Sequence, residues 1–216
     1  MKVLVVGANG QIGKQVVSLM KDNDALEATA MIRNVEQAPY FETMEAQTVV
    51  ADLEDDIDAL AKAAEGMDAI VFTAGSGPHT GKDKTIMVDL DGAIKTIEAA
   101  KRANVKRFIM ISSFDTTREA IQEASESFAP YVIAKHYADK WLRASDLQHT
   151  IIHPGLLTND AGNGEIEAAT NVARDEVPRA DIAEVIVSCL ESDATIGKEF
   201  QVVKGTTPIK KAMINL

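Results

Sequence analysis

The chain has 216 residues, of which 46% are hydrophobic, and it carries a formal net charge of −11. This length suits one α/β domain, and the acidic balance without a basic stripe excludes a nucleic-acid-binding protein. The single cysteine, Cys189, excludes an internal disulfide and a cysteine-rich metal site, and its apolar neighbours predict a core thiol. The first apolar stretch is too short for a signal peptide, and no segment reaches the roughly 18 apolar residues of a membrane span. We therefore expect a cytoplasmic protein that does not bind membranes.

Strand-like apolar runs alternate with helical patterns along the whole chain. This alternation predicts the α/β class: a single Rossmann-type domain over residues 1–216, with a doubly wound, mostly parallel sheet and helices on both faces. Residues 154–178 are rich in glycine and asparagine, and we expect a small irregular segment there, on the substrate side of the sheet. The expected strands are Lys2–Val6, Leu26–Ile32, Thr48–Ala51, Ala69–Thr73, Phe108–Ile111, Thr150–Ile152 and Glu199–Val203, and the expected helices are Gln11–Lys21, Val35–Met44, Ile57–Ala64, Lys84–Ala103, Tyr131–Ser145 and Ala180–Glu191.

Three glycines with the spacing G-x-x-G-x-x-G follow the first expected strand. The turn out of the strand needs a residue free of Cβ sterics, a pyrophosphate needs bare backbone N–H groups, and the next helix must pack close to the strand. A glycine-rich turn that binds nothing is the alternative, and the position between a strand and an apolar helix disfavours it. We expect the turn to hold a dinucleotide cofactor through Gly7, Asn9, Gly10, Gln11, Ile12 and Gly13.

Arg33 stands where dinucleotide-binding folds usually have an acidic residue, about 20 positions after the glycines. A guanidinium matches the 2′-phosphate of NADP(H) bidentately, whereas a carboxylate would repel it, so we predict NADP(H) as the cofactor. The alternative is a solvated arginine at a strand end. Asp52 and Leu53, directly after the third expected strand, are expected beside the adenine ring, although Asp52 could equally cap the next helix.

A second group of polar residues begins where the fifth expected strand ends, at Ser112 and Ser113. Tyr131 and Lys135 stand four apart on a helix, so they share one face. An ammonium near a phenol lowers the phenol's pKa from about 10 toward neutrality, which would make Tyr131 a proton donor to a carbonyl being reduced. A tyrosine and a lysine at this spacing are otherwise a common surface contact, so the assignment depends on the nucleotide motif and the serine pair.

With Pro154 and Gly155 after the sixth expected strand, these motifs resemble the short-chain dehydrogenases/reductases. The similarity is to the small atypical group of NAD(P)-binding oxidoreductases with NmrA-like and biliverdin-reductase-B-like relatives, and it covers nearly the whole chain. It implies that Tyr131 is the general acid/base, that Lys135 binds the ribose, and that Ser113 orients the carbonyl, with Ser112 as the alternative. The further cofactor contacts expected are Ala74, Gly75, Ser112, Pro154 and Gly155 at strand ends, and Lys135 on the helix.

Two positions depart from this resemblance. Asp89 stands where the classical members have an asparagine that continues the proton relay. The loop Ala74-Gly75-Ser76-Gly77-Pro78-His79 replaces their Asn-Ala-Gly motif. Some atypical members bind NADP(H) as sensors with little turnover, so the fold alone does not imply catalysis. The presence of Tyr131 favours an enzyme.

The function predicted from these residues is an NADP(H)-dependent reductase that passes a hydride from NADPH to a small carbonyl or quinone-like acceptor. The alternative is an NADP(H)-binding redox sensor. A nucleotide-sugar epimerase or dehydratase is disfavoured, because the short chain after the sixth expected strand leaves little room for a substrate lobe. A small-molecule substrate is the expected partner, and both monomer and dimer stay open. No metal site is expected, since the four histidines lack ligand spacing: His79, His136, His149 and His153.

Overall fold

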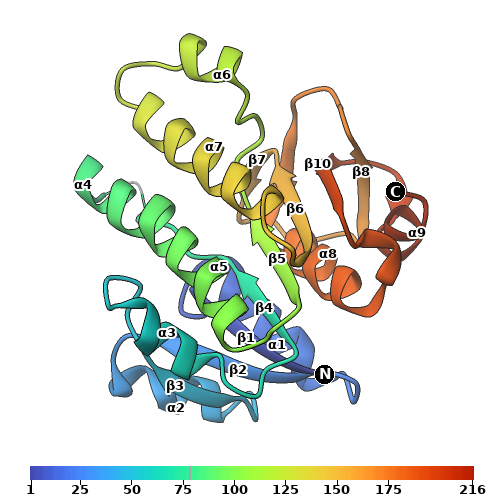
Figure 1. The fold of residues 1–216 in the computed structure, drawn as a ribbon. Coiled ribbons are helices and arrows are strands. Elements are labelled where there is room, and N and C mark those ends of the chain that lie inside the picture. Colours follow the sequence, from blue (N-terminus) through green and yellow to red (C-terminus); the bar gives the residue numbers. More distant parts are fainter. Residues whose placement is uncertain (78) are drawn as a thin grey trace.

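The computed structural model describes residues 1–77 and 79–216; Pro78, in the loop after the fourth expected strand, lies outside the described residues. The described chain forms a nine-stranded sheet with the order β11-β8-β10-β6-β5-β4-β1-β2-β3 (Figure 1). The strands of this sheet are β1 (Lys2–Val6), β2 (Glu27–Ile32), β3 (Gln47–Val50), β4 (Ala69–Phe72), β5 (Arg107–Ile111), β6 (Gln148–Pro154), β8 (Glu165–Ala169), β10 (Lys198–Lys204) and β11 (Thr207–Pro208).

The pairing from β3 to β10 is parallel throughout, which confirms the predicted α/β class and mostly parallel sheet. The central strands β1, β4 and β5 are buried along almost their whole length, because helices cover both of their faces. This double burial explains why they read as continuous apolar runs and not as alternating patterns. The carboxyl ends of these parallel strands lie along one edge of the sheet, where ligands of such folds bind.

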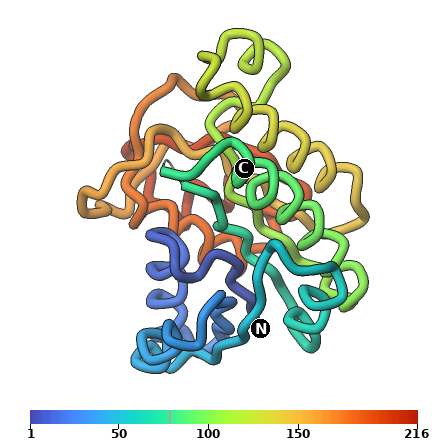
Figure 2. Tube along the Cα trace, turned by 90° about the vertical axis from the view of Figure 1, so that its left-hand side faces the viewer, coloured from blue at the N-terminus to red at the C-terminus, as the bar shows by residue number. Residues whose placement is uncertain are grey.

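Helices cover the sheet in two layers. On one face α1 (Gln11–Lys21) packs against α8 (Arg179–Glu191), and on the other α5 (Ala93–Arg102) lies between α3 (Ile57–Ala63) and α7 (Ala129–Arg143). Both views show α5 and α7 running side by side (Figure 1 and Figure 2). The remaining helices are α2 (Ala38–Glu42), α4 (Lys82–Lys84), α6 (Arg118–Glu123) and α9 (Ile209–Ile214), with short 3₁₀ turns η1 (Val35–Gln37) and η3 (Asp193–Thr195). None of the helices in the described residues is both long and apolar enough to cross a membrane.

The long helix expected over Lys84–Ala103 is not uniform. It begins as α4, continues as the π-helical stretch η2 (Thr85–Gly92), and becomes regular only in α5. π-Helical turns are often found at functional sites, because the extra residue per turn redirects a side chain. The stretch carries Asp89, which is fully buried.

Residues 154–178, expected to be irregular, contain three short strands separated by irregular stretches. In the structure β8 extends the main sheet antiparallel to β10, and β7 (Leu156–Thr158) pairs with β9 (Glu176–Pro178). The sequence of β8, Glu-Ile-Glu-Ala-Ala, buries only Ile166, so its membership of the sheet depends on partners distant in the sequence and not on an apolar run.

Candidate cofactor and catalytic site

The glycine turn between β1 and α1 has the geometry that a close-approaching ligand needs. Gly7 has φ of +82°, a left-handed conformation, and a Cβ on it would lie 2.6 Å from the backbone nitrogen of Ala74. A Cβ on Gly13 would lie 2.4 Å from the carbonyl oxygen of Gly7, so α1 packs against the turn only because that side chain is missing. Gly10 donates its N–H to Gly7 O at 2.9 Å and closes the turn.

A cavity of about 360 Å³ opens beside this turn, at the carboxyl ends of β2, β3 and β4. Its size falls in the range of small-molecule sites, roughly 300–1,000 Å³. The predicted residues that line it are Gly7, Asn9, Gly10, Arg33, Asp52, Leu53, Ala74 and Gly75. Of the turn residues, Gln11, Ile12 and Gly13 begin α1 and lie outside the lining, so their expected contacts stay predictions.

Several lining residues were not predicted, among them Gln37, Glu54 and Lys84. Lys84 binds the Glu54 carboxylate at 2.5 and 2.8 Å, which joins α4 to the loop after β3. The sequence held a sign of the position of Gln37, because Asn34 and Gln37 have the spacing of a capping box. In the structure they form that box, and Gln37 Oε1 also accepts the N–H of Arg33. The Glu54–Lys84 pair had no sequence signal, since its partners are 30 residues apart.

The alternative role of Asp52 as a helix cap does not apply. Asp56 is the residue that caps α3, by accepting the N–H of Ala59 at 2.8 Å. Asp52 accepts the N–H of Glu54 at 3.0 Å, which keeps it in the turn at the cavity wall.

The two serines at the end of β5 have different surroundings. Ser112 is buried and donates to Asp139 Oδ2 at 2.7 Å, a carboxylate that also accepts from Thr116 at 2.8 Å. Ser113 is close enough to Tyr131 for its hydroxyl to lower the pKa of the phenol. The successive side chains therefore point to different partners, and Ser113 is the serine placed beside the tyrosine.

Tyr131 lies in the first turn of α7, and the ammonium of Lys135 lies 5.8 Å from the centre of its ring. The expectation that Lys135 brings the pKa of Tyr131 down toward neutrality was wrong for this structure. Burial raises the pKa of Tyr131 above its usual value, and the charges of Asp89 and Asp139 add to the rise; Lys135 and Ser113 oppose it. Tyr131 therefore holds its proton at neutral pH.

Asp89 links the tyrosine–lysine pair to the cofactor cavity. Its Oδ2 accepts the N–H of Ser76 at 3.0 Å, and its Oδ1 lies 3.7 Å from Lys135 Nζ. A Cβ on Gly75 would lie 3.2 Å from this same Oδ1, so the loop after β4 passes close to the carboxylate. Burial disfavours the charged form of Lys135, but Tyr131 and Asp89 outweigh it, and the pKa of Lys135 is raised. The lysine therefore stays a cation.

Pro154 and Gly155, at the end of β6, pack into the C-terminal part of the sheet. Gly155 donates its N–H to Val202 O at 2.8 Å, and a Cβ on it would lie 2.1 Å from the carbonyl oxygen of Asp175. Neither residue lines the 360 Å³ cavity, so their contacts to a cofactor stay predictions.

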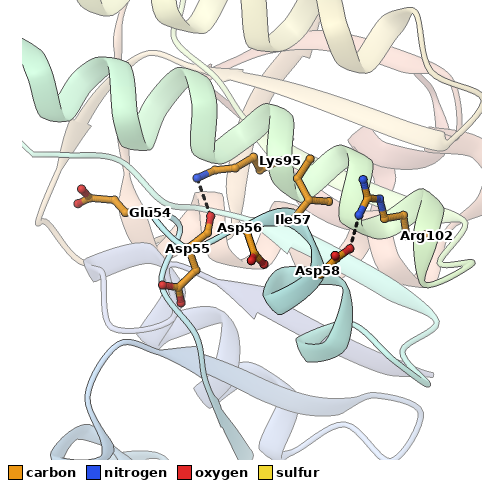
Figure 3. Close-up of a pocket in the computed structure, with 7 residues that line it drawn as sticks. All are labelled: Glu54, Asp55, Asp56, Ile57, Asp58, Lys95 and Arg102. Atoms are coloured by element: carbon orange, nitrogen blue, oxygen red, sulfur yellow. Dashed lines mark hydrogen bonds and ion pairs between the residues drawn. The ribbon is translucent and has the colours of Figure 1, made fainter.

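A second cavity, of about 490 Å³, lies on the surface between α3 and α5 (Figure 3). None of the residues predicted to form the site lines it. Its two cations are already engaged, since Lys95 donates to the carbonyl oxygen of Asp55 and Arg102 pairs with Asp58. This cavity therefore contributes nothing to the cofactor site.

A parallel sheet in the order 3-2-1-4-5-6, a glycine turn after its first strand and a cavity at its carboxyl edge define a nicotinamide-dinucleotide-binding protein with an oxidoreductase-like fold. Residues 7–193 match the family model described as NAD(P)H-binding, and the chain belongs to this family. The resemblance to the atypical short-chain dehydrogenases/reductases is confirmed.

Three relatives cover almost all of the chain. It is 46% identical to the uncharacterized sugar epimerase YhfK of Bacillus subtilis, over all of both chains. A structure from Bacillus halodurans, named as an NAD-dependent epimerase/dehydratase, shares 42% identity over all of both chains with a TM-score of 0.94. The oxidoreductase ylbE from Lactococcus lactis shares 33% identity with a TM-score of 0.91, and the match covers 100% of this chain and 96% of that one.

Proposed function

We propose that the protein is an NADP(H)-dependent reductase that acts on a small carbonyl or quinone-like acceptor, with Tyr131 as the proton donor. The observation that carries the proposal is the cluster of Ser113, Tyr131 and Lys135, which Asp89 joins to the wall of the dinucleotide cavity. The glycine turn has no room for a Cβ at Gly7 or Gly13, and a turn of bare backbone before a helix suits a pyrophosphate. A nicotinamide bound there would supply the hydride, and the side chains would bind, orient and protonate the acceptor.

The proton-donor role is supported by the state of Tyr131. Its raised pKa keeps the phenol protonated at neutral pH, as a general acid requires. Lys135, Ser113 and the N-terminus of α7 stabilise the negative charge that remains when the proton leaves.

The preference for NADP(H) is supported by Arg33. The residue is exposed at the end of β2 and lines the cavity. Within residues 1–77 and 79–216 it takes part in no ion pair, so its guanidinium is available to a 2′-phosphate.

The names of two relatives, a sugar epimerase and an NAD-dependent epimerase/dehydratase, favour a second candidate, an NAD-dependent sugar epimerase. The structure favours reduction instead, because the chain after β6 extends the sheet through β8, β10 and β11 and covers it with α8 and α9. Within the described residues this chain forms no separate lobe over the site. We would expect such a lobe to hold the nucleotide if the substrate were a nucleotide sugar.

The deciding experiment measures the fate of the cofactor. The protein is mixed with NADPH and a panel of aldehydes, quinones and flavins, and separately with nucleotide sugars and catalytic NADP⁺. A reductase consumes one NADPH for each acceptor reduced. Interconversion of a nucleotide sugar without net loss of cofactor would establish the epimerase, and tight NADPH binding without turnover on any acceptor would establish the redox sensor.

A further inference from the structure

A buried histidine, His153, lies on β6, which borders β5 on the side opposite to the strands whose ends line the cofactor cavity. His153, near the end of β6, lies between Asp139 of α7 and Glu199 of β10. One ligand-type atom from each of the three side chains comes within 4.8 Å of the others. The proposed reaction uses none of these residues.

The contacts of the His153 ring specify its protonation state. Its Nδ1 lies 2.5 Å from the carbonyl oxygen of Ser113, and its Nε2 lies 2.8 Å from Glu199 Oε1. A carbonyl oxygen can only accept a hydrogen bond, and so can an ionised carboxylate. Both ring nitrogens must therefore carry hydrogen, which makes the side chain an imidazolium cation.

Glu199 is ionised in this arrangement. Arg143 donates to the same carboxylate from Nε at 2.7 Å and from a terminal nitrogen at 3.1 Å. Although burial raises the pKa of Glu199, its hydrogen bonds to His153 and Arg143 lower it to about 2. The carboxylate is thus an acceptor at any pH at which the protein would function.

A metal ion is not the occupant that this cluster suits. Both ring nitrogens of His153 donate, so neither offers a lone pair to an ion. Asp139 Oδ2 accepts from both Ser112 and Thr116, and within the described residues Asp139 Oδ1 has no hydrogen-bond partner.

We propose that His153 is a positioning residue: as a cation bridged to Glu199, it holds the carbonyl of Ser113 and so keeps the Ser113 hydroxyl directed at Tyr131. The catalytic consequence depends on the function proposed above, whereas the charge of His153 does not. The next carbonyl is held in the same way, since Gln201 of β10 donates to Phe114 O at 2.9 Å. Strand β10 therefore fixes the turn that carries Ser113 at two successive points.

The charged groups around His153 come from two elements, β10 and α7. Glu199 contacts it from β10, Asp139 faces it from α7, and Arg143, also on α7, acts on it through Glu199. Burial opposes the charged ring, but the hydrogen bond to Glu199 and the charge of Asp139 prevail, and the pKa of His153 is raised. Once pH exceeds that raised pKa, the ionised Glu199 keeps the remaining hydrogen on Nε2, so Nδ1 presents a lone pair to Ser113 O and that hydrogen bond is lost.

The charge is tested by nitrogen NMR of protein labelled at histidine, with His153→Gln used to assign the signal among the four histidines. Both ring nitrogens of His153 are expected to be protonated at neutral pH. Glu199→Gln should make the ring lose its proton at a lower pH, whereas Glu167→Gln, at an exposed position of β8, should not. An unprotonated ring nitrogen in the wild type at neutral pH would overturn the proposal.

The positioning role is tested without turnover, by titrating the Tyr131 phenol, assigned by comparison with Tyr131→Phe. In folded His153→Gln the pKa of Tyr131 should rise, because the Ser113 interaction that lowers it is lost. If the protein reduces an acceptor, kcat should fall about ten- to a hundredfold with KM for NADPH unchanged. The wild-type rate should also decline at alkaline pH, and Glu199→Gln should shift that decline to lower pH. An unchanged Tyr131 titration in His153→Gln would contradict the positioning role, whatever the outcome for the reductase.

Discussion

The two halves of the sheet obey different rules. The half formed by β1, β2 and β3 depends on backbone sterics at the glycine turn, where Gly13 is enclosed by Gly7 and Ala8, and Gly7 by the backbone of Ala74 after the neighbouring strand β4. The half formed by β6, β8 and β10 is held by contacts between residues far apart, such as the ion pair of His153 and Glu199, which are 46 positions apart. The first half can be read from a motif, and the second only from the folded molecule.

The largest effect is expected at the glycine turn. Gly7→Ala should destabilise the protein by about 3 kcal/mol or more and abolish NADPH binding, because left-handed strain adds to a clash with the backbone of Ala74. The matched control is Gly66→Ala, with φ of +72° and no atom within 4 Å of the added Cβ. It should cost about 1 kcal/mol and leave binding intact. Urea unfolding and NADPH titration measure both, and equal losses in the two variants would refute the clash.

The second half contains a glycine that is just as enclosed but belongs to no motif. A Cβ on Gly205 would lie 2.3 Å from the backbone nitrogen of Glu167, so Gly205→Ala should separate β10 from β8 and cost about 1–3 kcal/mol. Cofactor affinity should not change, since the site lies in the other half. Gly197→Ala, which has open space around its Cβ but a left-handed φ of +73°, should cost about 1 kcal/mol from strain alone and serves as the control in the same unfolding measurement. A selective loss of NADPH binding in Gly205→Ala would show that the halves are coupled.

A smaller effect is expected at Arg33, in the half of the sheet formed by β1, β2 and β3, on the relative affinity for NADPH and NADH. Arg33→Asp should weaken NADPH binding about ten- to a hundredfold and leave NADH binding nearly unchanged, because a carboxylate repels the 2′-phosphate. Lys106→Asp makes the same charge change at an exposed position at the start of β5, outside the cavity lining, and should affect both cofactors little. Parallel titrations with the two cofactors measure the ratio. Equal weakening of NADPH by the two variants would mean that only net charge matters.

The smallest effect is expected when acid weakens the ion pair of His153 and Glu199, in the half of the sheet formed by β6, β8 and β10. The pKa of Glu199 is lowered from 4.5 to about 2 by folding, so its contribution to stability is present above pH 4.5 and is lost as pH falls toward 2. In Glu199→Gln the loss of stability between pH 4.5 and pH 2 should be smaller by about 1 kcal/mol, a figure that allows for solvent screening. Urea unfolding at a series of pH values measures this loss of stability, and Glu167→Gln should leave it unchanged. If the full loss persists in Glu199→Gln, it comes from other carboxylates.

Much of the fold was predictable because the central parallel strands β1, β4 and β5 are apolar runs that end in a turn. The core position of Cys189 was predicted in the same way and is confirmed, with burial raising the pKa of its thiol to about 12. Strand β8 could not be predicted, because it buries only Ile166 and owes its place to β10. The same limit explains the error at Tyr131: its spacing from Lys135 is local, but the burial that raises its pKa comes from the packed tertiary structure.

The site shows the same division. Residues fixed by the glycine turn or by a strand end, such as Arg33 and Gly75, were found from their positions in the sequence. The roles of Ser112 and Ser113 could not be separated, because that requires the direction of each side chain relative to α7. The bridge from Lys84 to Glu54 was missed, since surface charges at such separation carry no pattern.

The most direct test of the account is the rate of NADPH oxidation by an accepted aldehyde or quinone in Tyr131→Phe and Tyr137→Phe, compared with the wild type. The two tyrosines lie on the same helix, but Tyr137 is exposed and accepts a hydrogen bond from Arg118. Tyr131→Phe should lower kcat about 10²- to 10⁴-fold without weakening NADPH binding, and Tyr137→Phe should be close to the wild type. Unchanged turnover in Tyr131→Phe would contradict the assignment of Tyr131 as the proton donor.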